Sequence, residues 1–136
     1  MTDDEARAHF ETASVAYLAT VRPDGRPHVV PITFAIEADV IYTAVDAKPK
    51  RGTRLRRLEN VAVNPRVSVL VDAYDADWTR LWWARADGTA RVVTDGDDLE
   101  RALSALRARY PQYATVALTG PAMVIAVERW SGWSAT

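Results

Sequence analysis

The sequence predicts one domain built mainly from β-strands: an antiparallel barrel of about six strands with three packing helices. Three observations lead to this prediction. A chain of 136 residues fits a single domain, here residues 1–136. A tight hairpin joins the first strand-like segments, whereas helical segments separate the later ones. The composition, 49% hydrophobic and 26% charged, is ordinary for a globular protein and argues against disorder.

Apolar, β-branched runs bounded by turn residues predict the strands. The turn at residues 23–27 joins the first two, because proline presets φ and Asp-Gly tolerates positive φ. Pro31 lies inside the second strand and cannot donate to a ladder, so it indicates an edge, a bulge or a segment facing a ligand. A turn or bulge near Asp87 and Gly88 interrupts the fifth. The predicted strands cover residues 14–22, 28–36, 40–45, 66–71, 80–94 and 121–133.

Capping signals and a helical apolar period predict the three helices. Thr2 and Glu5 have capping-box spacing, which predicts a helix over about residues 2–13. The same spacing recurs at residues 97 and 100, ahead of the last helix. Thr53 is placed to cap the short middle helix. The predicted apolar faces are Leu55, Leu58 and Ala62 in the middle helix, and Leu99, Leu103, Leu106 and Tyr110 in the last.

Composition and missing motifs exclude several classes of function. With no cysteine, the chain has no disulfide framework, no cysteine-ligated metal and no cysteine nucleophile. It lacks a P-loop, a G-x-G-x-x-G fingerprint and an H-E-x-x-H metal motif. The acidic start lacks a signal-peptide pattern, and no apolar run approaches the ~20 residues of a membrane span. A net charge of −1 argues against a DNA-coating protein. We therefore expect a cytoplasmic protein with no metal, nucleic-acid or membrane partner.

Positive charge is concentrated where a predicted strand gives way to a predicted helix. Residues 48–57 carry six of the chain's 17 basic residues and no acid. Helix N-termini attract anions, and basic side chains add charge-assisted hydrogen bonds to phosphate oxygens. This pattern predicts a site for a cofactor phosphate or a polyanionic tail, with a solvated helix face and nucleic-acid binding as the alternatives. The residues expected to bind are Lys48, Lys50, Arg51 and Arg54, whereas Arg56 and Arg57 are expected in mid-helix and turned outward.

Tryptophans form the second notable pattern. Trp82 and Trp83 are neighbours on a predicted strand, so their side chains must point to opposite faces. One can serve the core; the other is either packed at a dimer interface or used as a stacking wall for a flat heterocycle. We expect Trp130 and Trp133 to pack at an interface. His28 is a weak catalytic candidate that is more simply read as a half-exposed strand residue, and His9 is expected on the surface.

Several segments together resemble a known family. The run A-x-L-A-T-V-R-P-D-G-R-P-H-V-V-P-I-T-F (residues 16–34), residues 40–43 and N-P-R-V-S-V (residues 64–69) resemble the pyridoxamine 5'-phosphate oxidase-like split β-barrel proteins. The runs K-P-K-R-G-T-R-L-R-R-L and D-W-T-R-L-W-W-A-R-A-D-G-T-A-R are most similar to the branch that uses the deazaflavin coenzyme F-420, familiar from actinobacteria. The resemblance covers nearly the whole chain.

The resemblance implies a fold, an assembly and a cofactor site. It implies a six-stranded antiparallel split β-barrel of the FMN-binding, flavin-reductase-like type, forming a homodimer with two cofactor sites at the subunit interface. The strand carrying Trp82 and Trp83 would face the cofactor ring. Trp83 stands where flavin-binding relatives often have a polar side chain, which disfavours FMN-dependent pyridoxamine phosphate oxidation. The implied phosphate ligands are Thr43, Lys48, Lys50, Arg51 and Arg54, and the backbone implied beside the ring is Val30, Pro31, Ile32 and Thr33.

These implications lead to one expected function and two alternatives. We expect an oxidoreductase that transfers hydride between coenzyme F-420 and a small organic substrate, with the protein supplying binding and orientation. Water or His28 would supply any proton. The first alternative is a non-catalytic carrier of the deazaflavin or of FMN with the same fold. The second is a haem-binding member of the group, with His28 or His9 as the axial ligand.

Overall fold

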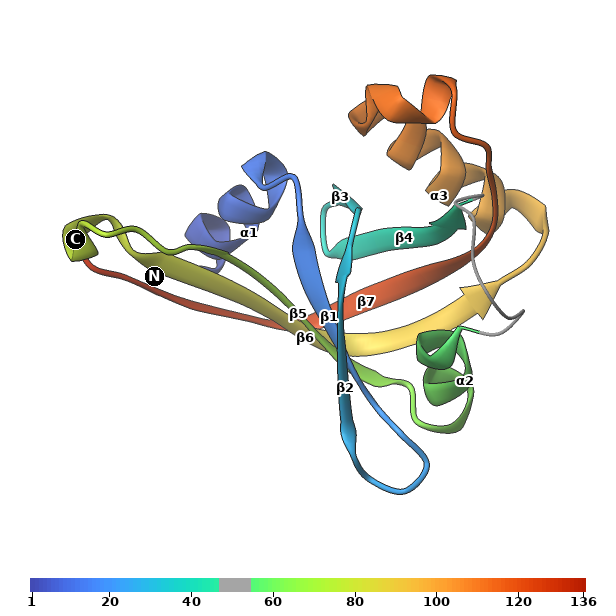
Figure 1. Ribbon diagram of the computed structural model, residues 1–136, viewed down its shortest axis with the longest axis horizontal. Helices are drawn as coiled ribbons and strands as arrows, with labels where there is room; N and C mark the ends of the chain where they lie inside the picture. The colour runs from blue at the N-terminus through green and yellow to red at the C-terminus, as the bar shows by residue number, and fades with distance from the viewer. Residues whose placement is uncertain (47–54) are drawn as a thin grey trace.

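The computed structural model describes residues 1–46 and 55–136. These residues form one antiparallel sheet of seven strands, in the order β2-β1-β5-β6-β7-β4-β3, with helices packed against it (Figure 1). The strands are β1 (Ala16–Val21), β2 (Pro27–Ile32), β3 (Ala35–Glu37), β4 (Val40–Asp46), β5 (Arg66–Ala73), β6 (Trp82–Val93) and β7 (Leu118–Ser134). The helices are α1 (Asp3–Thr12), α2 (Arg56–Val63) and α3 (Gly96–Arg109), with short 3-10 turns η1 (Trp78–Arg80) and η2 (Pro111–Ala114).

The predicted antiparallel sheet with packing helices is confirmed, but the predicted strand number and closure are wrong. The return strand expected over residues 28–36 breaks at Thr33 and Phe34, so it becomes β2 and β3 at opposite edges of an unclosed sheet. At the break, side-chain hydroxyls replace a neighbouring strand as hydrogen-bond partners of the backbone. The Phe34 N–H donates to the Tyr110 hydroxyl at 3.0 Å, and the Thr33 carbonyl accepts from the Thr43 hydroxyl at 2.8 Å.

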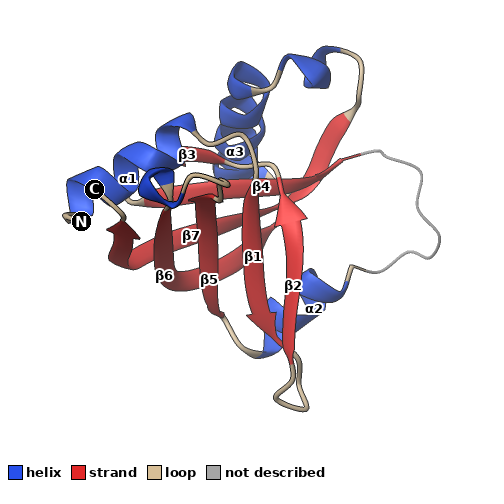
Figure 2. Ribbon diagram, turned by 60° about the vertical axis from the view of Figure 1, so that its left-hand side comes forward, coloured by secondary structure: helices blue, strands red, loops and turns tan. Residues whose placement is uncertain are grey.

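The two faces of the sheet are covered differently. Helices α1 and α2 pack on one face, which we call the inner face, around a core that includes Phe10, Leu18 and Val61. Helix α3 covers the other face over β4 and β7, with Leu103 and Leu106 buried there. Figure 2 shows α1 and α3 toward one end of the sheet and α2 near the β1–β2 turn. The opposite face over β2, β1, β5 and β6 therefore remains uncovered by the described residues, and we call it the outer sheet face.

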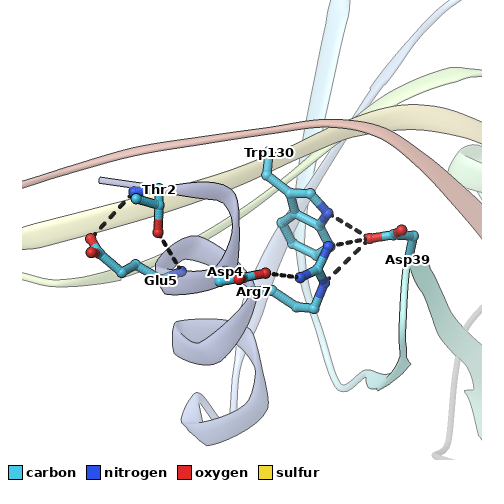
Figure 3. Close-up of polar contacts among 6 residues, drawn as sticks. All are labelled: Thr2, Asp4, Glu5, Arg7, Asp39 and Trp130. Carbon is cyan, nitrogen blue, oxygen red and sulfur yellow. Dashed lines mark hydrogen bonds and ion pairs between the residues drawn. The ribbon is translucent and has the colours of Figure 1, made fainter.

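The first helix begins as predicted, and its side chains attach it to the sheet. The Glu5 N–H donates to the Thr2 hydroxyl, and the Thr2 N–H donates to the Glu5 carboxylate, at 3.2 and 3.3 Å (Figure 3). One oxygen of Asp39 accepts from the Arg7 guanidinium, at 2.6 and 3.2 Å, and from the Trp130 indole N–H at 2.9 Å (Figure 3). Trp130 is buried in the inner core, so the interface role predicted for it is wrong.

The other helix starts differ from the predictions. Helix α3 begins at Gly96 with Asp95 as its N-cap, so no capping box forms at residues 97 and 100. Helix α2 has Leu55 as its N-cap, and Thr53 lies outside the described residues. The buried side of α2 includes Asn60 instead of the predicted Ala62, which is exposed. None of the helices described is long and apolar enough to span a lipid bilayer.

Candidate functional site

Strand β2 forms an edge of the sheet, as Pro31 predicted. It pairs with β1 alone among the described residues, so one side of its backbone is available to a ligand. Its side chains alternate: Val29 and Pro31 are exposed on the outer sheet face, whereas Ile32 is buried on the inner one. Val30 is half-buried on the inner side. An unpaired backbone edge suits a planar ligand that carries hydrogen-bonding groups along its rim.

Four polar side chains, two buried and two half-buried, lie between the β1–β2 turn and α2, and we call them the α2 cluster: Thr20 and Asn60, which are buried, and Arg22 and His28. Thr20 lies opposite His28 in the strand register, and Asn60 donates to the Thr20 hydroxyl at 2.9 Å. Among the residues that the structure describes, three buried atoms of the cluster have no hydrogen-bond partner: Arg22 Nε, His28 Nδ1 and Asn60 Oδ1. Buried polar atoms are costly to leave unpaired, so three in one cluster indicate a place prepared for a ligand or ordered water.

The α2 cluster lies in a positive environment. Burial lowers the pKa of His28, and the positive charges of Arg22, Arg56 and Arg57 lower it further. The N-cap residue of α2, Leu55, makes no side-chain hydrogen bond, so the helix end is not capped in the usual way. Arg56 and Arg57 lie in the first turn of α2, not in mid-helix as predicted. The N-terminus of α2 and these arginines together favour a bound anion.

The residues predicted to bind phosphate divide into two groups. Lys48, Lys50, Arg51 and Arg54 lie outside the described residues. Thr43 is buried, and its hydroxyl donates to the carbonyl of Thr33. In this chain Thr43 therefore holds the segment that leaves β2, next to the backbone predicted to contact the cofactor ring.

The two neighbouring tryptophans point to opposite faces, as predicted. Trp82 packs against the inner core and stacks on His9, with ring centroids 3.8 Å apart. His9 is therefore half-buried and not simply a surface residue. Trp83 lies on the other side of β6, with the Arg85 guanidinium 5.4 Å from its ring centroid. Trp133 is 48% exposed.

The outer sheet face carries exposed apolar side chains around a small polar network. Val29 is 61% exposed and Tyr17 is 42% exposed on it. In the network, Ser68 donates to one oxygen of Asp87 at 2.5 Å and Arg85 donates to the other at 3.2 Å. Large exposed apolar patches usually mark an interaction surface.

A cavity of about 370 Å³ lies beside Thr33, and we call it the Thr33 cavity. Its walls include Val15, Val116, Tyr110 and Tyr113. The hydroxyls of Thr33 and Tyr113 are 2.7 Å apart, and the two tyrosine rings meet edge to face. Neither this cavity nor the grouping of the α2 cluster follows from local sequence patterns, because both join residues distant along the chain. Among the described residues, no group of three or more histidine or acidic side chains could hold a metal ion.

Known structures share this fold over nearly the full chain. An FAD-binding protein of Mesorhizobium loti is 27% identical, with a TM-score of 0.72, covering 97% of this chain and 94% of its own. A conserved hypothetical protein of Mycobacterium tuberculosis is 22% identical, with a TM-score of 0.76, covering 99% and 86%. The haem storage protein HutZ of Vibrio cholerae is 16% identical, with a TM-score of 0.70, covering 96% and 92%.

The family is shown by the sequence itself. The family model described as pyridoxamine 5'-phosphate oxidase matches residues 2–134, which is almost the whole chain. The resemblance read from the hairpin of residues 16–34 is thus confirmed at the level of the family. The α2 cluster and the open edge of β2 belong to a member of the pyridoxamine 5'-phosphate oxidase family.

Proposed function

We propose that the protein is an oxidoreductase that uses the deazaflavin coenzyme F-420 to reduce or oxidise a small organic molecule. The observation that carries this proposal is the α2 cluster beside the open edge of β2. The unpaired Arg22 Nε–H, which can donate, and the surrounding arginines suit an anionic tail, whereas the β2 backbone suits a ring. His28 and Thr33 are five residues apart, about 16 Å along an extended chain, which leaves room for both parts of one cofactor.

The residues present fit such a group. Arg22 and Arg56 would hold the anionic tail, together with the basic residues at positions 48–54, and the edge of β2 would lie along the ring. When bound, the deazaflavin supplies a hydride donor or acceptor, so the protein need not provide a nucleophile or a metal. The protein's own contribution is to bind the tail, orient the ring and admit the substrate from one side.

Two further features support a flavin-like cofactor over a phosphorylated vitamin substrate. The Mesorhizobium loti relative, 27% identical, is an FAD-binding protein. Trp83, close to the Arg85 guanidinium, provides an aromatic surface on the outer sheet face. We propose FMN as the alternative cofactor.

We also propose that the protein forms a homodimer through the outer sheet face. The exposed side chains of Tyr17 and Val29 would be covered there by a second copy. Such a dimer would place the edge of β2 near the partner subunit. Light scattering of the purified protein tests this proposal, and a monomer at micromolar concentration would contradict it.

A second candidate is a binding protein without turnover, for the deazaflavin, FMN or haem. The shared fold with a haem storage protein favours this alternative. For haem, the buried and unpaired Nδ1 of His28 is the available ligand atom in the α2 cluster. A Soret band on mixing the protein with haem, lost in His28→Ala, would support it.

Titration of the purified protein with coenzyme F-420 and with FMN, followed by their emission, tests the main proposal. We expect micromolar or tighter binding of the deazaflavin, weakened about tenfold or more by Arg22→Gln combined with Arg56→Gln. Arg80→Gln is the matched control, since Arg80 is exposed at the far end of the sheet. Failure of both cofactors to bind overturns the proposal. Turnover of reduced deazaflavin with an acceptor then separates an enzyme from a carrier.

A further inference from the structure

Helices α1 and α3 lie on either side of β3 and form a groove that the proposed function does not use. Figure 2 shows β3 between the two helices, and both of them contact it. The groove has a volume of about 640 Å³, and we call it the β3 groove. Its lining includes Glu11, Ile36, Glu37, Arg101, Ala108 and Arg109. Strand β3 and the cofactor edge, β2, are at opposite ends of the sheet, so the β3 groove is separate from the α2 cluster.

The backbone of Ile36 offers one donor and one acceptor to the groove. A two-residue turn joins β3 to β4, and such a turn closes on a hydrogen-bonded pair, here Glu37 and Val40. Hydrogen-bonded and non-bonded pairs alternate, so the N–H and C=O of Ile36 point away from its partner, Ile41. In the part of the chain that the structure describes, no strand pairs with that edge of β3. Both groups are therefore available to a ligand in extended conformation.

One end of the β3 groove has an arginine that can bind a carboxylate. Burial raises the pKa of the Tyr42 hydroxyl, Glu37 raises it further and Arg101 lowers it. These directions fit a chain of hydrogen bonds in which Arg101 donates to the hydroxyl and the hydroxyl donates to Glu37. An arginine has five N–H donors, so this contact leaves donors of the exposed Arg101 for a ligand. A carboxylate is the group that a guanidinium binds most strongly.

The opposite end has an acid but no arginine with donors to spare. Arg109 lies one residue short of the end of the described helix surface, about 12 Å along the axis from Arg101. Its guanidinium already donates to four backbone carbonyls around the end of α1 and the start of β3, those of Phe10, Glu11, Ala13 and Phe34. The side chain of Glu11 is exposed here and lines the groove. This end therefore favours an ammonium group over a carboxylate.

We propose that the β3 groove binds a short zwitterionic peptide, about three residues long, as a strand added parallel to β3. Its N-terminal ammonium lies at Glu11 and its C-terminal carboxylate at Arg101. In this register the Ile36 N–H donates to the carbonyl of the first peptide residue, and the Ile36 carbonyl accepts from the N–H of the third. Three extended residues span about 10 Å, which fits between the two ends. The small side chain of Ala108 leaves room for those of the peptide.

Isothermal calorimetry with trialanine, titrated into the full chain without cofactor, tests the proposal directly. We expect a dissociation constant below about 1 mM. Two capped peptides are the comparisons: N-acetyl-trialanine lacks the ammonium group and trialanine amide lacks the carboxylate. Each should bind at least about fivefold more weakly than trialanine. A dissociation constant of trialanine above about 1 mM, or an unchanged affinity for either capped form, overturns the proposal.

A groove-filling variant then locates the binding site. Ala108→Trp places a large ring in the β3 groove and should weaken trialanine binding about tenfold or more. Ala8→Trp is the matched control, since Ala8 is an exposed helical alanine outside the lining of the groove. Ala108 is exposed as well, so both variants are expected to fold. Unchanged trialanine affinity in Ala108→Trp overturns the assignment.

The orientation of the peptide has its own test. Arg101→Gln should weaken trialanine about tenfold but leave the affinity for trialanine amide nearly unchanged, because the amide has no carboxylate to lose. Arg91→Gln, whose side chain is 58% exposed, is the matched control and should change neither affinity. An equal loss for both peptides in Arg101→Gln would place the carboxylate elsewhere and overturn the proposed orientation.

Discussion

The corner around Asp39 and the α2 cluster both contain polar groups beside the inner core, but they are satisfied to different degrees. One oxygen of Asp39 accepts three hydrogen bonds, from Arg7 and Trp130. In the α2 cluster, Arg22, His28 and Asn60 each keep a buried polar atom without a hydrogen-bond partner in residues 1–46 and 55–136. A complete set of hydrogen bonds stabilises the fold, whereas an incomplete set leaves binding capacity at a cost in stability. The corner around Asp39 therefore stabilises the fold, whereas the α2 cluster is the proposed binding region.

The largest expected effect comes from a substitution in the core beside the Asp39 corner. Phe10 is fully buried and meets Phe34 and Trp130 edge to face, with centroids 5.8 and 5.2 Å away. Phe10→Ala leaves a cavity under α1 and should lower the free energy of unfolding by about 3–5 kcal/mol. Urea denaturation measures this. Deazaflavin affinity of the folded fraction should remain within about twofold, because Phe10 belongs to α1, whereas the α2 cluster lies at the β1–β2 turn.

The second-largest effect is expected on cofactor affinity, from a substitution in the α2 cluster. Arg22→Met removes a buried donor and a positive charge, so deazaflavin affinity should fall about tenfold or more. The free energy of unfolding should stay unchanged or rise, because the buried Arg22 Nε has no hydrogen-bond partner in the part of the chain that the structure describes. Urea denaturation and emission titration of the same preparation check both halves. A large loss of stability without loss of affinity would reverse the assignment of the two regions.

Sequence reasoning succeeded where the signal was local and failed where it depended on pairing across the chain. The capping box at Thr2 and Glu5 and the edge position of β2 follow from neighbouring residues, and both are confirmed. The break between β2 and β3 depends on Tyr110, which is 76 residues from Phe34. No periodicity in residues 28–36 encodes such a contact.

Some residues of the candidate site could likewise be found from local sequence patterns, whereas others could not. The basic run of residues 48–57 was visible as a charge pattern, but the arginines described by the structure lie in the first turn of α2, where their charge lowers the pKa of His28. Arg22 and Asn60 were missed because Asn60 reaches the cluster from α2 by its bond to Thr20, the strand partner of His28, and Arg22 follows directly on β1. Trp130 was assigned to an interface because nothing local to it reveals its bond to Asp39, 91 residues away.

A smaller effect is expected on the pH dependence of stability, through the carboxyl group of Asp39. Hydrogen bonds from Arg7 and then from Trp130 lower the pKa of Asp39. A carboxyl whose folded pKa is lowered stabilises the protein above its unfolded pKa, and that stabilisation is lost as pH falls through the folded value. Asp39→Asn should therefore lower the Tm by a few degrees at pH 7. It should also make the Tm fall less steeply as the pH drops below about 4. Thermal melts from pH 2 to 7 measure this, with exposed Asp24→Asn as the control.

The smallest effect concerns His28, whose pKa in the free protein is lowered by burial and then by Arg22, Arg56 and Arg57. Its folded form prefers the neutral imidazole, so the protein should lose stability as pH falls below about 6.5, the usual histidine value. A bound anion offsets the surrounding positive charge and favours the protonated ring. Deazaflavin affinity should therefore rise modestly between pH 7.5 and 5.5, and His28→Gln should remove this rise while His9→Gln leaves it. A pH-independent affinity in the wild-type protein would show that the anion is held away from His28, by the basic residues at positions 48–54 instead.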